Sequence, residues 1–202
     1  MKDVSYSYAE RKFQALAGLE SLTVADKFFL QNSFSRSALN AYHESNLWPR
    51  FLRVGQERAL SSVSIVPYVE QNKDEIGEFI RIHRQSPYGT IGTYEYEFYL
   101  DENGANVINL EQGVTGVYVT YKKVYDPSFT EGSNDIPQEF LDYMLFTALG
   151  DFYTGDGQTE NAAVAYNRAG DSLSSELFRM EQKNNRNIMG IKIATHHTRQ
   201  LR

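Results

Sequence analysis

The periodicity of apolar residues changes twice along this chain of 202 residues, and that change constrains the fold most. Both ends carry apolar side chains at spacings of three and four residues, which is typical of amphipathic helices. The middle, from about residue 51 to residue 125, alternates apolar and polar residues, as strands with one buried face do. The order of helices, strands and helices therefore predicts an α+β protein with an inserted β module.

Two helices are predicted in the N-terminal region. The first spans about residues 5 to 18 and ends at Gly18, because glycine readily adopts the left-handed conformation that closes a helix. The second begins near Thr23, where Asp26 completes a capping box. The first helix has its apolar positions at Ala9, Phe13, Leu16 and Ala17. The second has its predicted apolar face at Ala25, Phe28, Phe29, Asn32, Leu39 and Tyr42.

The central region predicts a small antiparallel sheet of about four strands. Alternation is clearest in residues 78–84 and 94–99, and a further strand is expected over residues 116–125. Asn103 and Gly104 tolerate the positive φ angles of a tight turn, so we expect a hairpin there.

The C-terminal region predicts a pair of antiparallel helices. Pro137 suits a first helical turn, and the segment Gly155-Asp156-Gly157 separates two apolar stripes. The first stripe consists of Phe140, Leu141, Met144, Leu145, Ala148 and Phe152. The second consists of Ala162, Tyr166, Ala169, Leu173, Leu177 and Met180. Helices at both ends can close into one bundle of four main helices that carries the antiparallel β-sheet module.

These patterns divide the chain into four parts. Residues 1–50 hold the N-terminal helices of the bundle, and residues 51–126 form the inserted β module. Residues 127–183 form the C-terminal helical hairpin, and residues 184–202 form an extended basic tail. The longest apolar stretch is too short to span a bilayer, so we expect a soluble chain.

Composition excludes several kinds of chemistry. The chain has no cysteine, so it holds no disulfide, thiolate zinc site, Fe–S cluster or thiol nucleophile. The four histidines lack the spacing of metal pairs, and Asp151, Asp156 and Glu160 supply only fragments of a calcium loop. Neither a phosphate loop nor a nucleophile elbow occurs. We therefore expect no catalytic residue, no metal ligand and no cofactor.

Charge is distributed unevenly between the body of the chain and its end. The net charge is −6, but residues 182–202 contain five basic residues and no acid, which leaves −11 for the rest. An acidic body argues against a surface that binds nucleic acid throughout. The tail also has an apolar centre, so we predict that it docks on a partner, and a solvated end is the alternative. Its candidate binding residues are Arg186, Ile188, Met189, Ile191, Lys192, Ile193, Arg199 and Arg202.

Tyrosine is abundant, with 14 residues, and several lie on the predicted strands. About half of these must face the core. The others predict a protein-binding or sugar-binding surface, since tyrosine gives contact area at a low cost in entropy. The candidates are Tyr94, Tyr96 and Tyr118.

Three segments resemble the head-to-tail adaptor, also called connector or tail tubular protein, of tailed bacteriophages. The first is Leu47-Trp48-Pro49-Arg50-Phe51-Leu52, which resembles a tryptophan motif before the adaptor's sheet. The second is Ile136-Pro137-Gln138-Glu139-Phe140, followed by Ala148, Asp151 and Phe152. The third is a returning helix with Ala162, Ala165, Tyr166 and Ala169. The middle of the chain departs from the family, because it lacks the usual Pro-x-Asp strand link.

The resemblance implies a structural virion protein, not an enzyme, located in the neck between head and tail and made in the host cytoplasm. Its copies would form a ring, commonly of twelve, with the tails gripping the portal protein ring. The sheet modules would meet a tail tube or nozzle protein, with Tyr94, Tyr96 and Tyr118 as the tail-side interface. Genomic DNA would pass only as cargo, and no membrane would be bound.

Two other classes of function stay open from the sequence. A carbohydrate- or receptor-binding module using the tyrosine-rich sheet would need an exposed aromatic cleft. A metal-independent hydrolase would need a pocket with two close carboxyl groups whose pKa values differ.

Overall fold

The computed structural model describes residues 2–61, 64–88 and 94–182, and the backbone of the last helix beyond them. The chain divides into two compact units. We call Met1–Glu44 with Pro127–Arg202 the helical unit, and Ser45–Asp126 the β unit. The fold is mixed α+β, as predicted, with four α-helices and several antiparallel sheets in the described part. The side chains of the predicted tail, 184–202, lie outside the described residues. The backbone of the last helix continues through this segment to Arg199, so the prediction of an extended tail is not confirmed.

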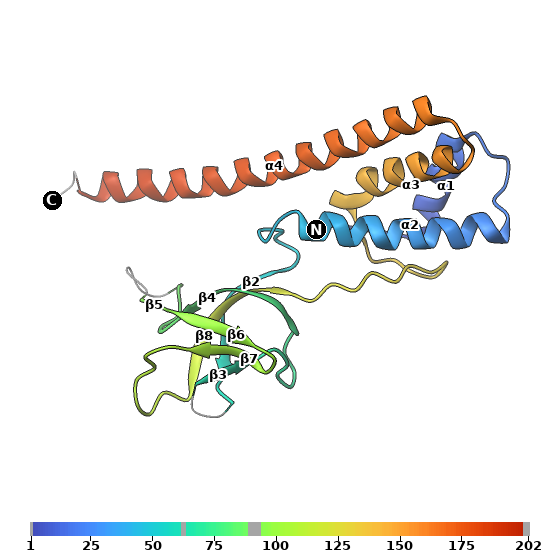
Figure 1. The fold of residues 1–202 in the computed structure, drawn as a ribbon. Helices are drawn as coiled ribbons and strands as arrows, with labels where there is room; N and C mark the ends of the chain where they lie inside the picture. Colours follow the sequence, from blue (N-terminus) through green and yellow to red (C-terminus); the bar gives the residue numbers. More distant parts are fainter. Residues whose placement is uncertain (1, 62–63, 89–93, 200–202) are drawn as a thin grey trace. The chain divides into compact units, whose positions relative to one another are not determined.

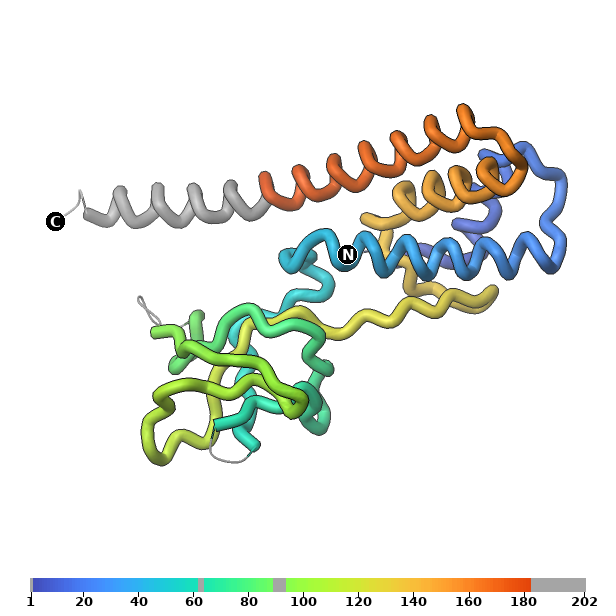
Figure 2. The backbone as a smooth tube through the Cα atoms, viewed as in Figure 1, coloured from blue at the N-terminus to red at the C-terminus, as the bar shows by residue number. Residues whose placement is uncertain are grey.

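Both ends of the chain build the helical unit. Figure 2 shows the blue N-terminal segment beside the segment that follows the β unit. Helix α3 packs against the other three helices and lies between α2 and α4 (Figure 1). The helices are α1 (Tyr6–Ala17), α2 (Val24–His43), α3 (Leu141–Gly155) and α4 (Thr159–Arg199). The remaining elements are the antiparallel strands β1 (Asp3–Val4) and β9 (Ile136–Pro137) and a 3-10 turn at Gln138–Phe140.

The N-terminal helices begin and end where the sequence predicts. Ser5 caps α1 by accepting a hydrogen bond from the backbone N–H of Tyr8, and Gly18 closes the helix with a φ of 68°. Thr23 and Asp26 form the predicted capping box at the start of α2. The N–H and C=O groups at a helix end lack partners inside the helix, and each of these caps supplies such a partner from a residue close by in the sequence. Neighbouring sequence is therefore enough to predict the helix ends.

The predicted apolar face of α2 is wrong. The buried side chains are Leu30, Ser33, Phe34, Ser37, Ala38, Ala41 and Tyr42, so only Tyr42 belongs to the predicted set. Phe28 and Leu39 are exposed. Two serines occupy the buried face because the chain satisfies their hydroxyls: Ser37 donates to the carbonyl of Ser33, and Ser33 donates to Asp151.

The predicted stripes of α3 and α4 are largely confirmed. Leu141, Met144, Leu145 and Ala148 are buried in α3. In α4, Ala162, Ala169, Leu173 and Met180 are buried, but Tyr166 is exposed and Ala165 is buried instead. The ring of Tyr166 lies against Gly150, where an added Cβ would approach it to 2.6 Å. The missing side chain of Gly150 therefore lets this ring pack close to α3.

The β unit contains two antiparallel sheets, so the prediction of about four strands is too low. One sheet has the order β2-β8-β4-β5 and the other the order β3-β7-β6. The first consists of β2 (Leu52–Ala59), β8 (Gly116–Lys123), β4 (Ile76–His83) and β5 (Glu95–Tyr96). The second consists of β3 (Ile65–Pro67), β7 (Gly104–Val107) and β6 (Phe98–Asp101). Strands of two to four residues are too short to show alternation.

Residues of both sheets share one apolar core, which includes Val66 and Ala105 from one sheet and Ile82 and Val119 from the other. The predicted hairpin is confirmed, since Asp101 pairs with Gly104 across the turn. Strand β4 does not keep strict alternation, because its pairing with β8 shifts twice. Phe79 and Ile82 are consequently both buried although they are three residues apart.

Candidate functional site

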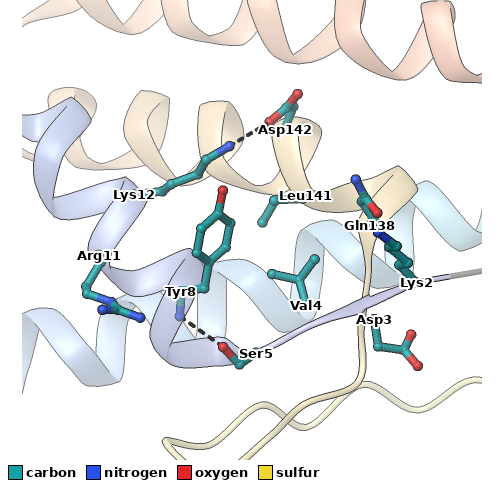
Figure 3. Close-up of a pocket in the computed structure, with 10 residues that line it drawn as sticks. All are labelled: Lys2, Asp3, Val4, Ser5, Tyr8, Arg11, Lys12, Gln138, Leu141 and Asp142. Carbon is teal, nitrogen blue, oxygen red and sulfur yellow. Dashed lines mark hydrogen bonds and ion pairs between the residues drawn. The ribbon is translucent and has the colours of Figure 1, made fainter.

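A cleft of about 510 Å³ opens on the helical unit beside strand β1. Its lining comes from three places: β1 with the residues flanking it, the first two turns of α1, and the start of α3 (Figure 3). Tyr8 stands in the middle of the view, with Arg11 on one side and Val4 and Leu141 on the other. The volume lies in the range of small-ligand sites.

Three cations line this cleft, namely Lys2, Arg11 and Lys12, against two acids, Asp3 and Asp142. Lys12 Nζ lies 3.9 Å from Asp142 and 5.4 Å from the centroid of the Tyr8 ring, so its charge is partly compensated. Arg11 donates from Nε to the carbonyl oxygen of Ser7 in its own helix. The guanidinium of Arg11 therefore brings a positive charge to the cleft without a carboxylate at salt-bridge distance among the described residues.

A second polar cluster lies inside the β unit around Arg58, whose side chain is fully buried. Its guanidinium lies 4.7 Å from the centroid of the Tyr121 ring and donates to the Tyr121 hydroxyl and to the carbonyl of Asp74. Glu70 lies 3.8 Å away. Burial raises the pKa of Tyr121, and the nearby Arg58 opposes this shift. Among the described residues only one guanidinium nitrogen of Arg58 finds hydrogen-bond acceptors, whereas its buried Nε and Nη1 atoms find none and Nη1 faces Glu70 at 3.8 Å. No sequence signal singled out Arg58.

His83 and Lys122 are also buried, on β4 and β8. The Nε2 atom of His83 lies 3.1 Å from the hydroxyl of Thr120, and that hydroxyl accepts from the backbone N–H of Gly55. Burial lowers the pKa of His83 and that of Lys122, because it disfavours the charged form of each. Lys122 contacts Asn46.

The structure does not bring the three candidate tyrosines onto one face. Tyr96 pairs in register with Ile82, which pairs with Val119, and both partners are buried in the core. Tyr96 therefore points to the core side, and its hydroxyl donates to Glu111. Desolvation and this hydrogen bond raise its pKa to about 12. Tyr118 pairs with His83 and so points to the opposite face.

Tyr94 differs from both, since 79% of its surface is exposed. Tyr88 and Tyr99 are exposed as well, although neither was a candidate. The tail candidates, from Arg186 to Arg202, lie outside the residues whose side chains are described.

Two helices carry exposed apolar side chains in addition to their buried faces. On α2 these are Val24, Phe28 and Leu39, of which Phe28 is 67% exposed. On α4 they are Val164 and Phe178, the latter 62% exposed. Helix α3 lies between α2 and α4 (Figure 1), so the sides of α2 and α4 that are turned away from α3 point away from each other. We call them the α2 outer face and the α4 outer face.

Within the described part of the chain, histidine and carboxylate side chains never gather in groups of three that could hold a metal ion. No described helix is both long and apolar enough to cross a membrane. Comparison with protein-family models finds no match, and no curated protein matches the chain.

Proposed function

We propose that this chain is a structural head-to-tail adaptor of a tailed bacteriophage, whose copies form a ring beneath the portal. In this proposal the four helices make a bundle that lies against the neighbouring copies. The C-terminal tail, with Arg186 to Arg202, grips the portal ring, and the β unit meets the tail tube or nozzle protein. The three segments that resemble the adaptor family support the proposal.

The observation that carries the proposal is the pair of outer faces on α2 and α4. The side chains of Phe28 and Phe178 are apolar and exposed, so the free energy of the system falls when a partner covers them. The two faces differ in sequence and point away from each other, so the contact of one copy with the next is heterologous. Heterologous contacts close into rings when the rotation between copies permits.

The two outer faces also match in spacing. Val24 and Leu39 lie about 22 Å apart along α2, and Val164 and Phe178 about 21 Å apart along α4, at ~1.5 Å per residue.

The test combines the purified chain with portal rings from the same genome and measures assembly by sedimentation and cryo-EM. Wild-type chains should form a ring on the portal. Phe28→Glu and Phe178→Glu should each prevent ring closure, because each places a charge in an apolar contact. Leu16→Glu is the matched control, since Leu16 is an exposed residue on α1. A ring that forms equally well with all three variants would refute these interfaces.

The tail is tested separately on portal-bearing heads. Truncation after Lys183 should leave the helical unit folded and abolish attachment. Charge reversal of Arg199 and Arg202 should weaken attachment and reduce its salt dependence. Equal binding by the truncated and complete chains would show that the tail does not grip the portal.

A sugar- or receptor-binding module is a second candidate, because Tyr88, Tyr94 and Tyr99 are exposed on the β unit. Glycan-array binding that is lost in Tyr94→Ala and kept after tail truncation would favour this function over the adaptor.

A further inference from the structure

The cleft beside β1 concentrates cations on a body of the helical unit, residues 1–44 and 127–181, that is otherwise strongly acidic. Residues 1–44 and 127–181 contain 7 basic and 15 acidic residues, a net charge of −8. Three of those seven basic residues, Lys2, Arg11 and Lys12, line this one cleft. The other cations include Lys27, Arg36 and Arg179, and each of these is held by a carboxylate within 3.5 Å. In the cleft, Lys12 is likewise paired with Asp142, at 3.9 Å.

The arrangement of the lining residues indicates the shape of a ligand. Figure 3 shows Arg11 and Lys2 towards opposite ends of the cleft, with Tyr8, Val4 and Leu141 between them. Tyr8 is exposed, so its ring can cover an apolar side chain. Along the cleft, a cation at one end is therefore followed by an apolar surface and then by a cation at the other end.

We propose that this cleft binds an extended acidic segment of a partner protein, with carboxylates at its two ends and an apolar residue between them. Arg11 binds one carboxylate through its free guanidinium nitrogens, and Lys2 attracts the other. The apolar residue lies over Tyr8 and Val4. Carboxylate is the group that the planar guanidinium fork matches best in a protein ligand.

An acidic peptide fits this cleft better than a nucleic acid does. Asp3 and Asp142 also line it, and two acids beside a phosphate backbone would repel the closely spaced charges of DNA or RNA. A peptide can place its own N–H groups beside these acids and its carboxylates beside the cations. The proposal does not depend on the adaptor function.

The experiment measures fluorescence anisotropy of a labelled peptide with Glu-Asp at both ends and Leu-Val in the middle, added to the full chain at low salt. We expect binding that weakens as salt is added. Arg11→Ala should raise the Kd about tenfold, as loss of a charge-assisted hydrogen bond predicts. Tyr8→Ala should also weaken binding, and a peptide with serine in the middle should bind less tightly.

The matched control is Arg179→Ala, which removes the same charge from an exposed residue of α4 paired with Glu176. It should leave the Kd unchanged. If both substitutions have the same effect, or if Arg11→Ala has none, the peptide binds elsewhere, for instance on the basic tail, and the proposal is wrong. Absence of peptide binding, or tighter binding of a single-stranded oligonucleotide with the same dependence on Arg11, would equally overturn it.

Discussion

The helical unit buries mainly leucine, methionine, phenylalanine and alanine, whereas the β unit also buries the charged side chains of Arg58 and Lys122. In the helical unit the buried polar side chains are small and uncharged, as with Ser37, and the charged contacts lie at the edge of the core, where Asp151 accepts from Ser33, Arg36 and Tyr166. The helical unit therefore depends mainly on complementary shape, and the β unit also depends on buried polar groups, of which Arg58 and His83 are only partly hydrogen-bonded. Substitutions that leave cavities should reduce the stability of the helical unit most. Substitutions that leave charges or polar groups without partners should reduce the stability of the β unit most.

The largest expected effect is in the β unit, at Arg58. Arg58→Ala would remove a donor to the Tyr121 hydroxyl, which also donates to Gln56, and to the Asp74 carbonyl, and it would leave a cavity. We expect a loss of about 3–5 kcal/mol in the free energy of unfolding, as for other large buried side chains replaced by alanine. Hydrogen exchange of peptides from residues 45–126 measures it. Arg81→Ala is the control, because Arg81 forms an exposed pair with Glu95 that should contribute less than about 1 kcal/mol.

A cavity in the helical unit should be nearly as costly. Leu145 is 2% exposed in α3, so Leu145→Ala should reduce the free energy of unfolding by about 2–5 kcal/mol. Urea unfolding followed by far-ultraviolet circular dichroism measures the loss, and Leu16→Ala on α1 provides an exposed control. A small effect would show that neighbouring side chains fill the space and that shape matters less here than we infer.

A smaller effect is expected where α3 and α4 approach each other. Gly150→Ala would place a methyl group 2.6 Å from the Tyr166 ring, at a cost of about 1–3 kcal/mol. Gly170→Ala on α4 meets no atom within 4 Å and should stabilise the helix by up to about 1 kcal/mol. Thermal unfolding of the two variants should thus shift in opposite directions. A stabilising effect of both would mean that the Tyr166 ring moves aside freely.

The smallest expected effect is a dependence of stability on pH, which should be confined to the β unit. Burial lowers the pKa of His83 in the folded chain, so the unfolded chain binds the proton more readily. Neutral His83 therefore contributes its full share to the free energy of unfolding above the ordinary histidine pKa of about 6.5. This contribution decreases as the pH falls below that value. Hydrogen exchange of residues 76–83 at two pH values measures this, and His83→Gln should remove the dependence. An unchanged slope in that variant would assign the effect to other groups.

Local signals in the sequence predict the ends of elements well. Gly18, the Thr23 and Asp26 box and the Asn103-Gly104 turn act within a few residues, so neighbouring sequence is sufficient to predict them. Long regular stripes, as in α3 and α4, are also predictable, since their spacing repeats over several turns.

The interior contacts were less predictable, for different physical reasons. The face of α2 was assigned wrongly because Ser33 and Ser37 are polar in sequence but satisfied in the fold. The shifts in β4 arise from its pairing with β8, which no local pattern records. Arg58 was missed because its partners Asp74 and Tyr121 lie far from it in sequence. The cleft likewise joins residues 2–12 to residues 138–142 and has no contiguous motif.

The construction of the helical unit from both chain ends has a consequence for synthesis on the ribosome. Helices α1 and α2 are made first, but α3, against which both pack, is made only after the whole β unit. The β unit has its own core and can fold while the nascent chain is still growing. Until translation reaches α3, Phe13 lacks the ring of Phe152 that packs against it in the folded unit. This interval is therefore when the nascent chain is most exposed to aggregation and to chaperones.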